Sequence, residues 1–297
     1  MRGLGIVIVL LALSACGLQS QSDGSNPPGS AGSAAGGAPV TELKVDKSFW
    51  HHGFKVTLGT AKVVEGKIDD VTRAVTIEAT FQNLSLEYEG HGISYAVLTV
   101  GDRTYAELAD DLLDMPEVPP QRSQRGTLAY EVDEHFVLQD AVLIVGKPDV
   151  RQAVVPLGRA EGLVSLEPRP ITVSGKVEYK TNSTFFMTVE SGEVRSDKPL
   201  THLEAPTGKE WVRLNFSATN NSNAGMAIVF DDELTLKLPN GTTIGTDLAC
   251  SAAQIWPSEH STATGGLACF LVPAPASGTY TMLWENFAKG GLTFTIG

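Results

Sequence analysis

The feature of this sequence that most constrains its fold is a strand pattern that occurs twice. Residues 73–85 (RAVTIEATFQNLS) alternate apolar and polar side chains, and residues 210–222 (EWVRLNFSATNNS) repeat that alternation in the second half. A period of two puts the apolar side chains on one face, which is typical of a half-buried β-strand. Each run ends in a turn-prone cluster in which an asparagine can cap its own backbone. The chain therefore contains two related β-rich units.

The match between the halves continues over other segments in the same order. The paired segments are 54–64 with 185–195, 95–107 with 232–247, 127–132 with 267–272, and 140–158 with 280–297. Each unit of about 120 residues holds about seven short strands and almost no helical periodicity, which is the pattern of a β-sandwich. We therefore predict an all-β protein with two tandem immunoglobulin-like β-sandwiches after a disordered N-terminal tether.

The domain boundaries follow from this pattern. The first β-sandwich is predicted over 41–165 and the second over 169–297, with a connection over 158–176. Residues 106–117 (AELADDLLDMPE) are the one candidate helix.

A family resemblance rests on an Asn-x-Ser after the alternating strand, a hairpin with a glycine turn, a proline loop and a G-x-L-x-Φ-x-V strand. The residues that carry it are Asn83-Leu84-Ser85, Gly126-x-Leu128-x-Tyr130-x-Val132 and Gly266-Leu267. This pattern resembles a family of uncharacterised bacterial lipoprotein domains that are similar to the secreted immunoprotective antigen of mycobacteria. The resemblance covers both halves and implies immunoglobulin-like domains outside the cytoplasm. It brings no catalytic residues and no common activity.

The N-terminus predicts export and a lipid anchor. Arg2 precedes an apolar run that is too short to span a bilayer, and Leu13-Ser14-Ala15-Cys16 follows it. This pattern resembles a bacterial lipobox, so residues 1–15 are predicted to be a lipoprotein signal peptide and Cys16 the site of lipid attachment in the cell membrane. The alternative is a simple secretory peptide cut after Ala15, which leaves Cys16 as a free thiol. Residues 16–40, dominated by Gly, Ser, Ala and Pro, are predicted to be a disordered linker.

The other cysteines are Cys250 and Cys269, and an even pair in an exported chain predicts one structural disulfide. A redox-active pair is the weaker alternative, because the chain has no Cys-x-x-Cys motif.

Catalytic and metal motifs do not emerge from the sequence. The net charge of −12 argues against a nucleic-acid partner. The chain has no Gly-x-Ser-x-Gly elbow and no zinc-type His/Cys spacing. In FWHHGFK (49–55) we expect Phe49 or Trp50 to pack at a domain edge and His51 and His52 to be solvated, because adjacent residues of a strand point to opposite faces. Carboxylates at 109–114 and 229–234 match no twelve-residue calcium loop. We therefore expect no catalytic residue, no metal and no cofactor.

Trp256 is the best sequence candidate for a binding residue. Trp211 and Trp284 fall within predicted core strands, whereas Trp256 lies in a loop. The structural alternative is that Trp256 packs over the disulfide.

The expected function is a lipid-anchored, non-catalytic binding or scaffolding role in the cell envelope, with an envelope protein or a glycan as partner. The alternative is an envelope enzyme, or the accessory subunit of one, with a site at the junction near residues 158–176.

Overall fold

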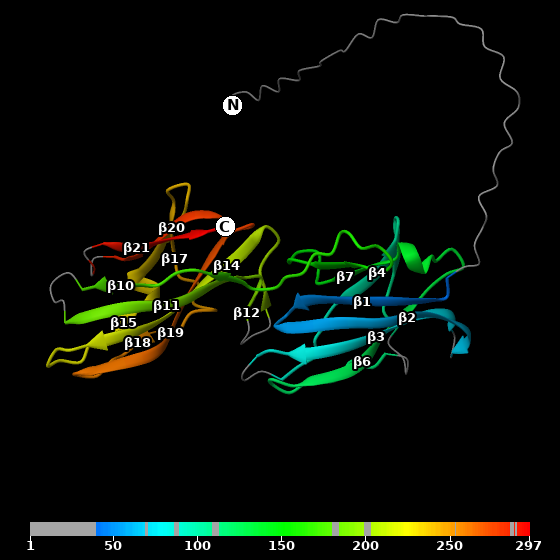
Figure 1. Cartoon of the computed structure of the whole chain (residues 1–297), viewed down its shortest axis with the longest axis horizontal. Coiled ribbons are helices and arrows are strands. Elements are labelled where there is room, and N and C mark those ends of the chain that lie inside the picture. Colours follow the sequence, from blue (N-terminus) through cyan, green and yellow to red (C-terminus); the bar gives the residue numbers. More distant parts are fainter. Residues whose placement is uncertain are drawn as a thin grey trace, which may run out of the picture. The chain divides into compact units, whose positions relative to one another are not determined.

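The computed structural model describes residues 40–297 except for 69–70, 86–88, 109–112, 180–183, 199–202, 253, 286–287 and 289. The predicted signal peptide, the predicted lipid site Cys16 and nearly all of the predicted linker lie outside the described residues. The regular secondary structure of the described chain is almost entirely β-strand, which confirms the predicted all-β class (Figure 1).

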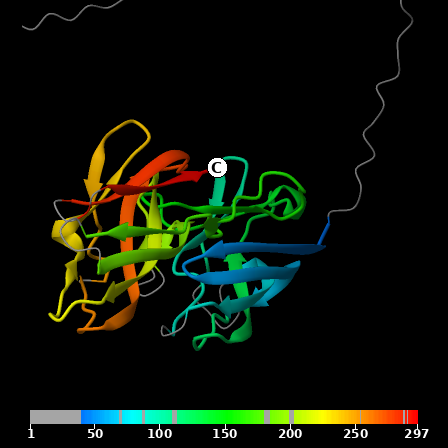
Figure 2. The same ribbon diagram turned by 60° about the vertical axis from the view of Figure 1, so that its left-hand side comes forward.

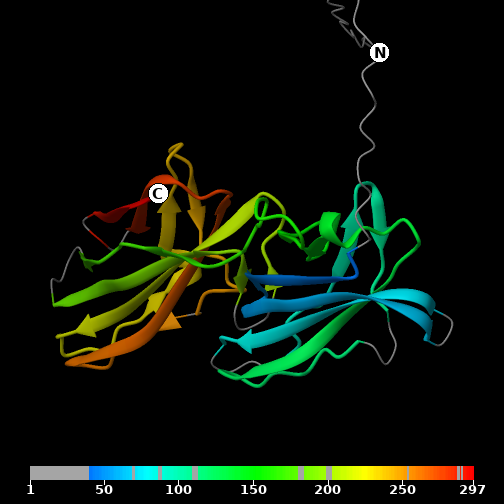
Figure 3. The ribbon, with the colours of Figure 1, turned by 45° about the vertical axis from the view of Figure 1, so that its right-hand side comes forward.

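The first sandwich consists of two antiparallel sheets. One has the order β1-β2-β3-β6 and the other the order β5-β4-β7-β8. The strands are β1 (Glu42–His51), β2 (Phe54–Ile68), β3 (Val71–Asn83), β4 (Ala96–Val100), β5 (Arg103–Tyr105), β6 (Ser123–Glu131), β7 (Val142–Val145) and β8 (Ala153–Pro156), with a single 3-10 turn, η1 (Leu138–Asp140), before β7. In Figure 3 the blue-to-cyan strands β1–β3 and the green β6 form one layer of this sandwich.

The second sandwich repeats this topology. The sheet β10-β11-β14-β19 corresponds to the first sheet above, and β17-β16-β20-β21 corresponds to the second. The strands are β9 (Arg169–Ile171), β10 (Gly175–Glu178), β11 (Phe185–Arg195), β14 (Lys209–Asn220), β16 (Leu234–Lys237), β17 (Thr243–Gly245), β19 (Ser261–Pro273), β20 (Gly278–Trp284) and β21 (Gly291–Ile296). Figure 2 shows the red strands β20 and β21 in the layer that faces the layer of β11 and β14.

Short elements complete the second sandwich. They are the hairpin of β12 (Asp197–Lys198) with β13 (Leu203–Glu204), the pair of β15 (Ile228–Val229) with β18 (Gln254–Ile255), and the single helical turn α1 (Phe230–Glu233).

The strand order in both units is that of an immunoglobulin-like sandwich. In the first unit β2, β3 and β6 take the places of strands A, B and E, while β4, β5, β7 and β8 take those of C, C′, F and G. Strand β1 adds to the free edge of β2 through a two-residue turn, in which His52 and Gly53 both have positive φ, as a type I′ hairpin requires.

The registers of the two units match, apart from one bulge between β14 and β19 that the pairing of β3 with β6 lacks. Phe54 pairs with Asn83 in the first unit, and Phe185 pairs with Asn220 in the second. Gly126 and Gly266 also occupy equivalent positions, opposite Ala79 and Phe216. A Cβ at Gly126 would lie 2.1 Å from the Asp114 carbonyl oxygen, and one at Gly266 would lie 2.6 Å from the Phe216 ring. The glycine of the repeated motif is therefore required by close packing.

Each sandwich encloses its own core. The first cluster of buried apolar side chains runs from Val45 to Leu166 and the second from Ile171 to Ile296. The connection between the cores is shorter than predicted, because Leu166 is buried in the first core and Val164 bridges Val154.

The predicted helix over 106–117 is wrong for the described residues. Glu107 and Asp114 form isolated bridges with Tyr130 and Thr127, and the Leu108 amide donates to the Ala129 carbonyl at 2.9 Å. Backbone pairing along β6 outweighs the local helix propensity of this segment. Residues 109–112 lie outside the described residues.

Candidate functional site

Trp256 lies on a loop frame at the end of the second sandwich. The buried Asn220 at the end of β14 holds two loops together. Its Nδ2 donates to the carbonyl of Ala224 at 2.7 Å and to that of Pro257 at 3.4 Å. Its Oδ1 accepts the backbone N–H of Ser222 at 3.0 Å, which confirms the predicted asparagine turn.

His260 reinforces the same frame. It adopts a positive φ of 51° directly before β19, and its Nε2 lies 2.7 Å from Asn223 Oδ1. The indole of Trp256 lies close to Gly225, where an added Cβ would come 3.3 Å from Nε1. The loops that flank Trp256 are therefore tied to each other and to the sheet.

The first sandwich contains the same frame without the tryptophan. Asn83 is buried, and its Nδ2 donates to the Val118 carbonyl at 2.9 Å. Gln121 has a positive φ of 56°, and its Nε2 donates to the carbonyls of Leu84 and Ser85 at 2.8 and 2.9 Å. Val118 is equivalent to Pro257, because each accepts the buried asparagine, and Gln121 is equivalent to His260, because both have positive φ. The residue before Val118, Glu117, is therefore the equivalent of Trp256, and it is also exposed. The frame therefore places a solvent-facing residue at this position and does not itself need an aromatic side chain.

Trp256 is 62% exposed, more than any other large hydrophobic side chain of the described residues. The alternative in which it packs over the disulfide is wrong. Trp211 takes that place, since it is 2% exposed and clusters with Cys269, Cys250 and Ala205.

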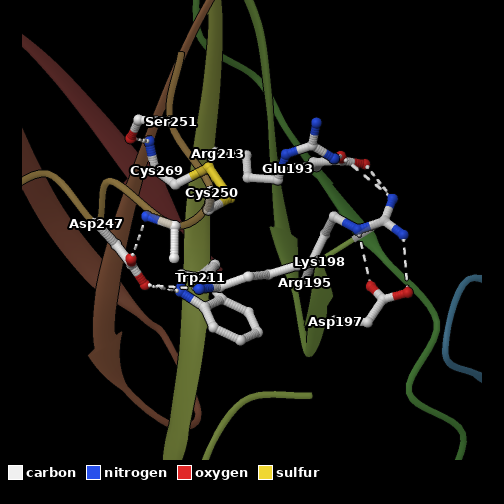
Figure 4. Close-up of a disulfide and its surroundings, with 11 residues drawn as sticks. Glu193, Arg195, Asp197, Lys198, Trp211, Arg213, Asp247, Cys250, Ser251 and Cys269 are labelled. Atoms are coloured by element: carbon white, nitrogen blue, oxygen red, sulfur yellow. Dashed lines mark hydrogen bonds and ion pairs between the residues drawn. A yellow bond between two sulfur atoms is a disulfide. The ribbon is translucent and has the colours of Figure 1, made fainter. Parts of the chain in front are cut away.

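The disulfide predicted from the sequence is present between Cys250 and Cys269. Figure 4 shows it beside Trp211 on β14, whose Nε1 donates to Asp247 Oδ2 at 2.8 Å. Lys198 Nζ lies 3.3 Å from the same carboxylate oxygen and 4.8 Å from the Trp211 ring centroid. These contacts hold the loop before Cys250 against the sheet, and the disulfide fastens the same loop to β19. The cysteine pair therefore has a structural role.

The repeat shows what the disulfide replaces. Ala129 and Ala74 occupy the positions of Cys269 and Trp211, and they form a small buried cluster with Leu108. The amide of Leu108 donates to Ala129 as the amide of Asp247 donates to Cys269, at 2.9 and 2.7 Å. A covalent link thus takes the place of an apolar contact.

The second notable group of residues lies where the two sandwiches meet. Both belong to one compact unit, Pro39–Gly297. Val150 bridges Pro206, and the amides of Arg151 and Thr207 donate to the carbonyls of Ala205 and Asp149 at 3.0 and 3.1 Å. We call these contacts, with the side chains around them, the joint.

A buried histidine–carboxylate pair lies in the joint. His51, at the end of β1, has Nε2 2.6 Å from Oε1 of Glu204 on β13, and the two side chains are 0% and 2% exposed. Burial lowers the pKa of His51 to about 4 and raises the pKa of Glu204 to about 8. The expectation that both histidines are solvated is therefore wrong for His51. The alternation of a strand gives one inward side chain in two, but the sequence does not show that a second domain covers it.

The carboxylate of Asp197 acts on the pKa of both groups and belongs to a cluster of charged side chains in the joint. The Arg195 guanidinium lies 5.5 Å from the Trp50 ring centroid, and the indole Nε1 of Trp50 donates to Asp197 Oδ2 at 3.4 Å. Arg195 is itself held by Asp197 at 2.8 Å and by Glu193 at 3.3 Å (Figure 4). Most charges of the joint are therefore paired within the protein.

Glu210 anchors a second set of ion pairs. Its carboxylate pairs with Arg151 of the first sandwich and with Arg169 at 3.0 Å, and it accepts the amide of Ala276 at 2.8 Å.

Within the described ranges no group of three or more His, Cys, Asp or Glu side chains is placed to hold a metal ion. No helix in this part of the chain is long and apolar enough to cross a membrane. Of the carboxylates considered for calcium, Asp114 is exposed and Asp111 lies outside the described residues.

Comparisons with protein-family models, with curated proteins and with solved structures found no match to this chain. The likeness of its two halves to each other is thus the comparison that informs the site, and it singles out Trp256.

Proposed function

We propose that this protein is a lipid-anchored component of a bacterial cell envelope and that it binds a partner without catalysis. The lipobox-like sequence at Cys16 supports the anchor, and the linker after it would carry the two sandwiches away from the membrane. The net charge of −12 supports a protein or glycan partner over a nucleic acid.

The observation that carries the binding role is the exposure of Trp256. A tryptophan that is 62% exposed contributes little to the fold, and tryptophan is enriched among the residues that dominate binding interfaces. The equivalent position in the first sandwich holds the exposed Glu117, so folding does not demand an aromatic residue there.

The location of Trp256 also favours binding. Strand β14 is 12 residues long and leads from the joint, at Thr207, to Asn220 beside the Trp256 loop. At about 3.3 Å per residue, Trp256 lies roughly 40 Å from the joint along the strand. A partner could contact it without disturbing the contacts between the sandwiches.

The enzyme alternative has one observation in its favour. His51 and Glu204 converge at the joint with shifted pKa values, as acid–base pairs in active sites do. However, side chains that are 0% and 2% exposed offer no access to a substrate. We therefore assign the pair to the joint and the function to the exposed loop.

The experiment is site-specific photo-cross-linking in cells. A photoreactive phenylalanine analogue replaces Trp256 in the full chain, and a matched chain carries it at Glu117. Cross-linked material is purified and identified by mass spectrometry, and Cys16→Ser provides the unanchored control. We expect one reproducible envelope product from position 256, none from position 117, and loss of the product in Cys16→Ser.

Two results would argue against this proposal. If positions 256 and 117 give the same products, Trp256 has no special role. If Cys16→Ser keeps the same partner and incorporates labelled fatty acid as the unmodified chain does, Cys16 is not the anchor.

A further inference from the structure

A hollow of about 400 Å³ lies on the outer side of the first sandwich. Its lining comes from β1, β2, the end of β3 and the segment after β8, and consists of Ser48, Phe49, Trp50, Lys55, Gln82, Leu84, Ser165 and Glu167. The segment after β8 is fixed to β1, because the amide of Trp50 donates to Ser165 Oγ at 2.9 Å and the amide of Leu166 donates to the Trp50 carbonyl at 3.1 Å. The wall of the hollow is thus part of the fold.

Three polar side chains reach this hollow without a partner. Lys55, Gln82 and Glu167 are exposed, and within the described residues none of them makes a side-chain hydrogen bond or an ion pair. They surround the half-buried Trp50 and Leu84, which supply apolar surface. A few convergent polar groups around an aromatic side chain, in a space of this size, are typical of a small-ligand site.

The second sandwich serves as an internal comparison. By register, Lys176, Glu178 and Phe186 are the equivalents of Ser48, Trp50 and Lys55. There the three side chains satisfy each other. Lys176 Nζ lies 3.7 Å from the Phe186 ring centroid and 3.0 Å from a Glu178 carboxylate oxygen.

The residue equivalent to Gln82 is Thr219, and its side chain also has a partner within the protein. The Thr219 hydroxyl lies 2.9 Å from the hydroxyl of Thr262. In the second sandwich the polar side chains of this surface therefore pair with one another. In the first sandwich the side chains of Lys55, Gln82 and Glu167 remain unpaired around the indole of Trp50.

We infer that this hollow of the first sandwich binds one or two pyranose rings of an uncharged glycan. A pyranose presents an apolar C–H face, which suits an indole, and a rim of hydroxyl groups that both donate and accept hydrogen bonds. The Gln82 amide can donate and accept, Lys55 donates, and Glu167 accepts. The opposite charges of Lys55 and Glu167 offset each other, which favours an uncharged ligand over an acidic one.

The test is titration calorimetry of the full, detergent-solubilised chain with cellotetraose, chitotetraose and maltotetraose, and with tetragalacturonate as the acidic comparison. We expect at least one uncharged tetrasaccharide to bind and tetragalacturonate to bind more weakly. Gln82→Ala and Lys55→Ala should each weaken binding by about tenfold. Gln124→Ala, an exposed glutamine on β6 of the same sheet, is the matched control and should bind as the unmodified chain does.

Trp256→Phe separates this site from the proposed partner surface. Unchanged glycan binding in Trp256→Phe supports the hollow, even if the cross-linking experiment finds no protein. The inference is overturned if no uncharged tetrasaccharide binds up to its solubility limit, if Gln82→Ala and Lys55→Ala bind as tightly as Gln124→Ala, or if Trp256→Phe abolishes binding.

Discussion

His51 Nε2 lies 2.6 Å from Glu204 Oε1, and this contact joins the last residue of β1 in one sandwich to β13 of the other. Gly146, with a φ of +107°, packs against both side chains, since an added Cβ would lie 3.1 Å from His51 Nε2 and 3.2 Å from Glu204 Oε2. The Asp197 carboxylate raises the pKa of both groups, whereas His52 and Arg151 lower that of Glu204. The pair is thus enclosed by groups from both sandwiches.

This geometry predicts a defined pH dependence of the free energy of unfolding. Burial raises the pKa of Glu204 from 4.5 to about 8 and lowers that of His51 from 6.5 to about 4. Between pH 4.5 and 6.5, the pair binds one proton in both the folded and the unfolded chain, so its contribution is flat. Above pH 6.5 the unfolded chain loses that proton while folded Glu204 keeps it up to about pH 8. Stability therefore falls as pH rises, by about 2 kcal/mol.

Urea unfolding between pH 5 and pH 8.5 checks this prediction. Glu204→Gln keeps the shape of the side chain but cannot ionise, so its curve should be flat above pH 6.5. Glu161→Gln, at an exposed position, should retain the fall seen in the unmodified chain. An identical pH profile for Glu204→Gln and Glu161→Gln would contradict the prediction.

The sandwich fold can be predicted from the sequence, because the patterns that specify it are local. Alternation over 73–85 and 210–222 defines the inner strands β3 and β14, and the asparagine that ends each strand closes the expected turn. The disulfide is predictable because the chain has so few cysteines. Each of these features depends on a few neighbouring residues or on a count.

The joint could not be predicted from the sequence, because the burial of its residues depends on a neighbouring domain. His51 has the sequence surroundings of a turn residue, and Glu204 lies 153 residues further along the chain. The helix prediction over 106–117 is wrong for a related reason, because Asp114 pairs with Thr127 of β6, a strand outside the segment. The sequence predicts that Trp256 lies in a loop, but only the structural correspondence of the two repeats shows that Glu117 is its equivalent.

Removing the disulfide should lower stability without changing the fold. The link closes a loop between residues 19 apart, for which chain entropy predicts about 3 kcal/mol. The variant Cys250→Ala/Cys269→Ala is suitable, because the repeat has Ala129 at the position of Cys269. We expect a lower urea midpoint and an unchanged far-UV spectrum. Reduction of the unmodified chain should give the same midpoint as the variant, and a clear difference between the two would contradict this account.

The two loop-frame asparagines should be equivalent in stability. Asn83 and Asn220 are both fully buried and hold equivalent loops through side-chain hydrogen bonds. Each change to alanine removes the side-chain amide that donates to these carbonyls and the oxygen that accepts a backbone N–H two residues on, which costs about 1–3 kcal/mol. Asn240→Ala is the matched control, because among the described residues the one hydrogen bond of this exposed side chain is from the Thr242 amide, at 3.0 Å. Thermal unfolding should rank Asn83→Ala and Asn220→Ala well below Asn240→Ala. Equal midpoints for all three variants would show that the frame does not depend on the asparagines.

Trp256→Glu should leave stability unchanged while it removes the proposed contact. Glutamate is the residue that the first sandwich places at this position, and Trp256 is 62% exposed, so the free energy of unfolding should change by no more than about 0.5 kcal/mol. Trp211→Phe provides the contrast. Trp211 is 2% exposed and donates to Asp247 Oδ2 at 2.8 Å. Its replacement leaves a buried gap and removes this donor, so that Lys198 is the remaining partner of that oxygen. Urea titration should therefore show a loss of about 1–3 kcal/mol for Trp211→Phe. A comparable loss for Trp256→Glu would mean that Trp256 serves the fold, and the binding role assigned to it would have to be withdrawn.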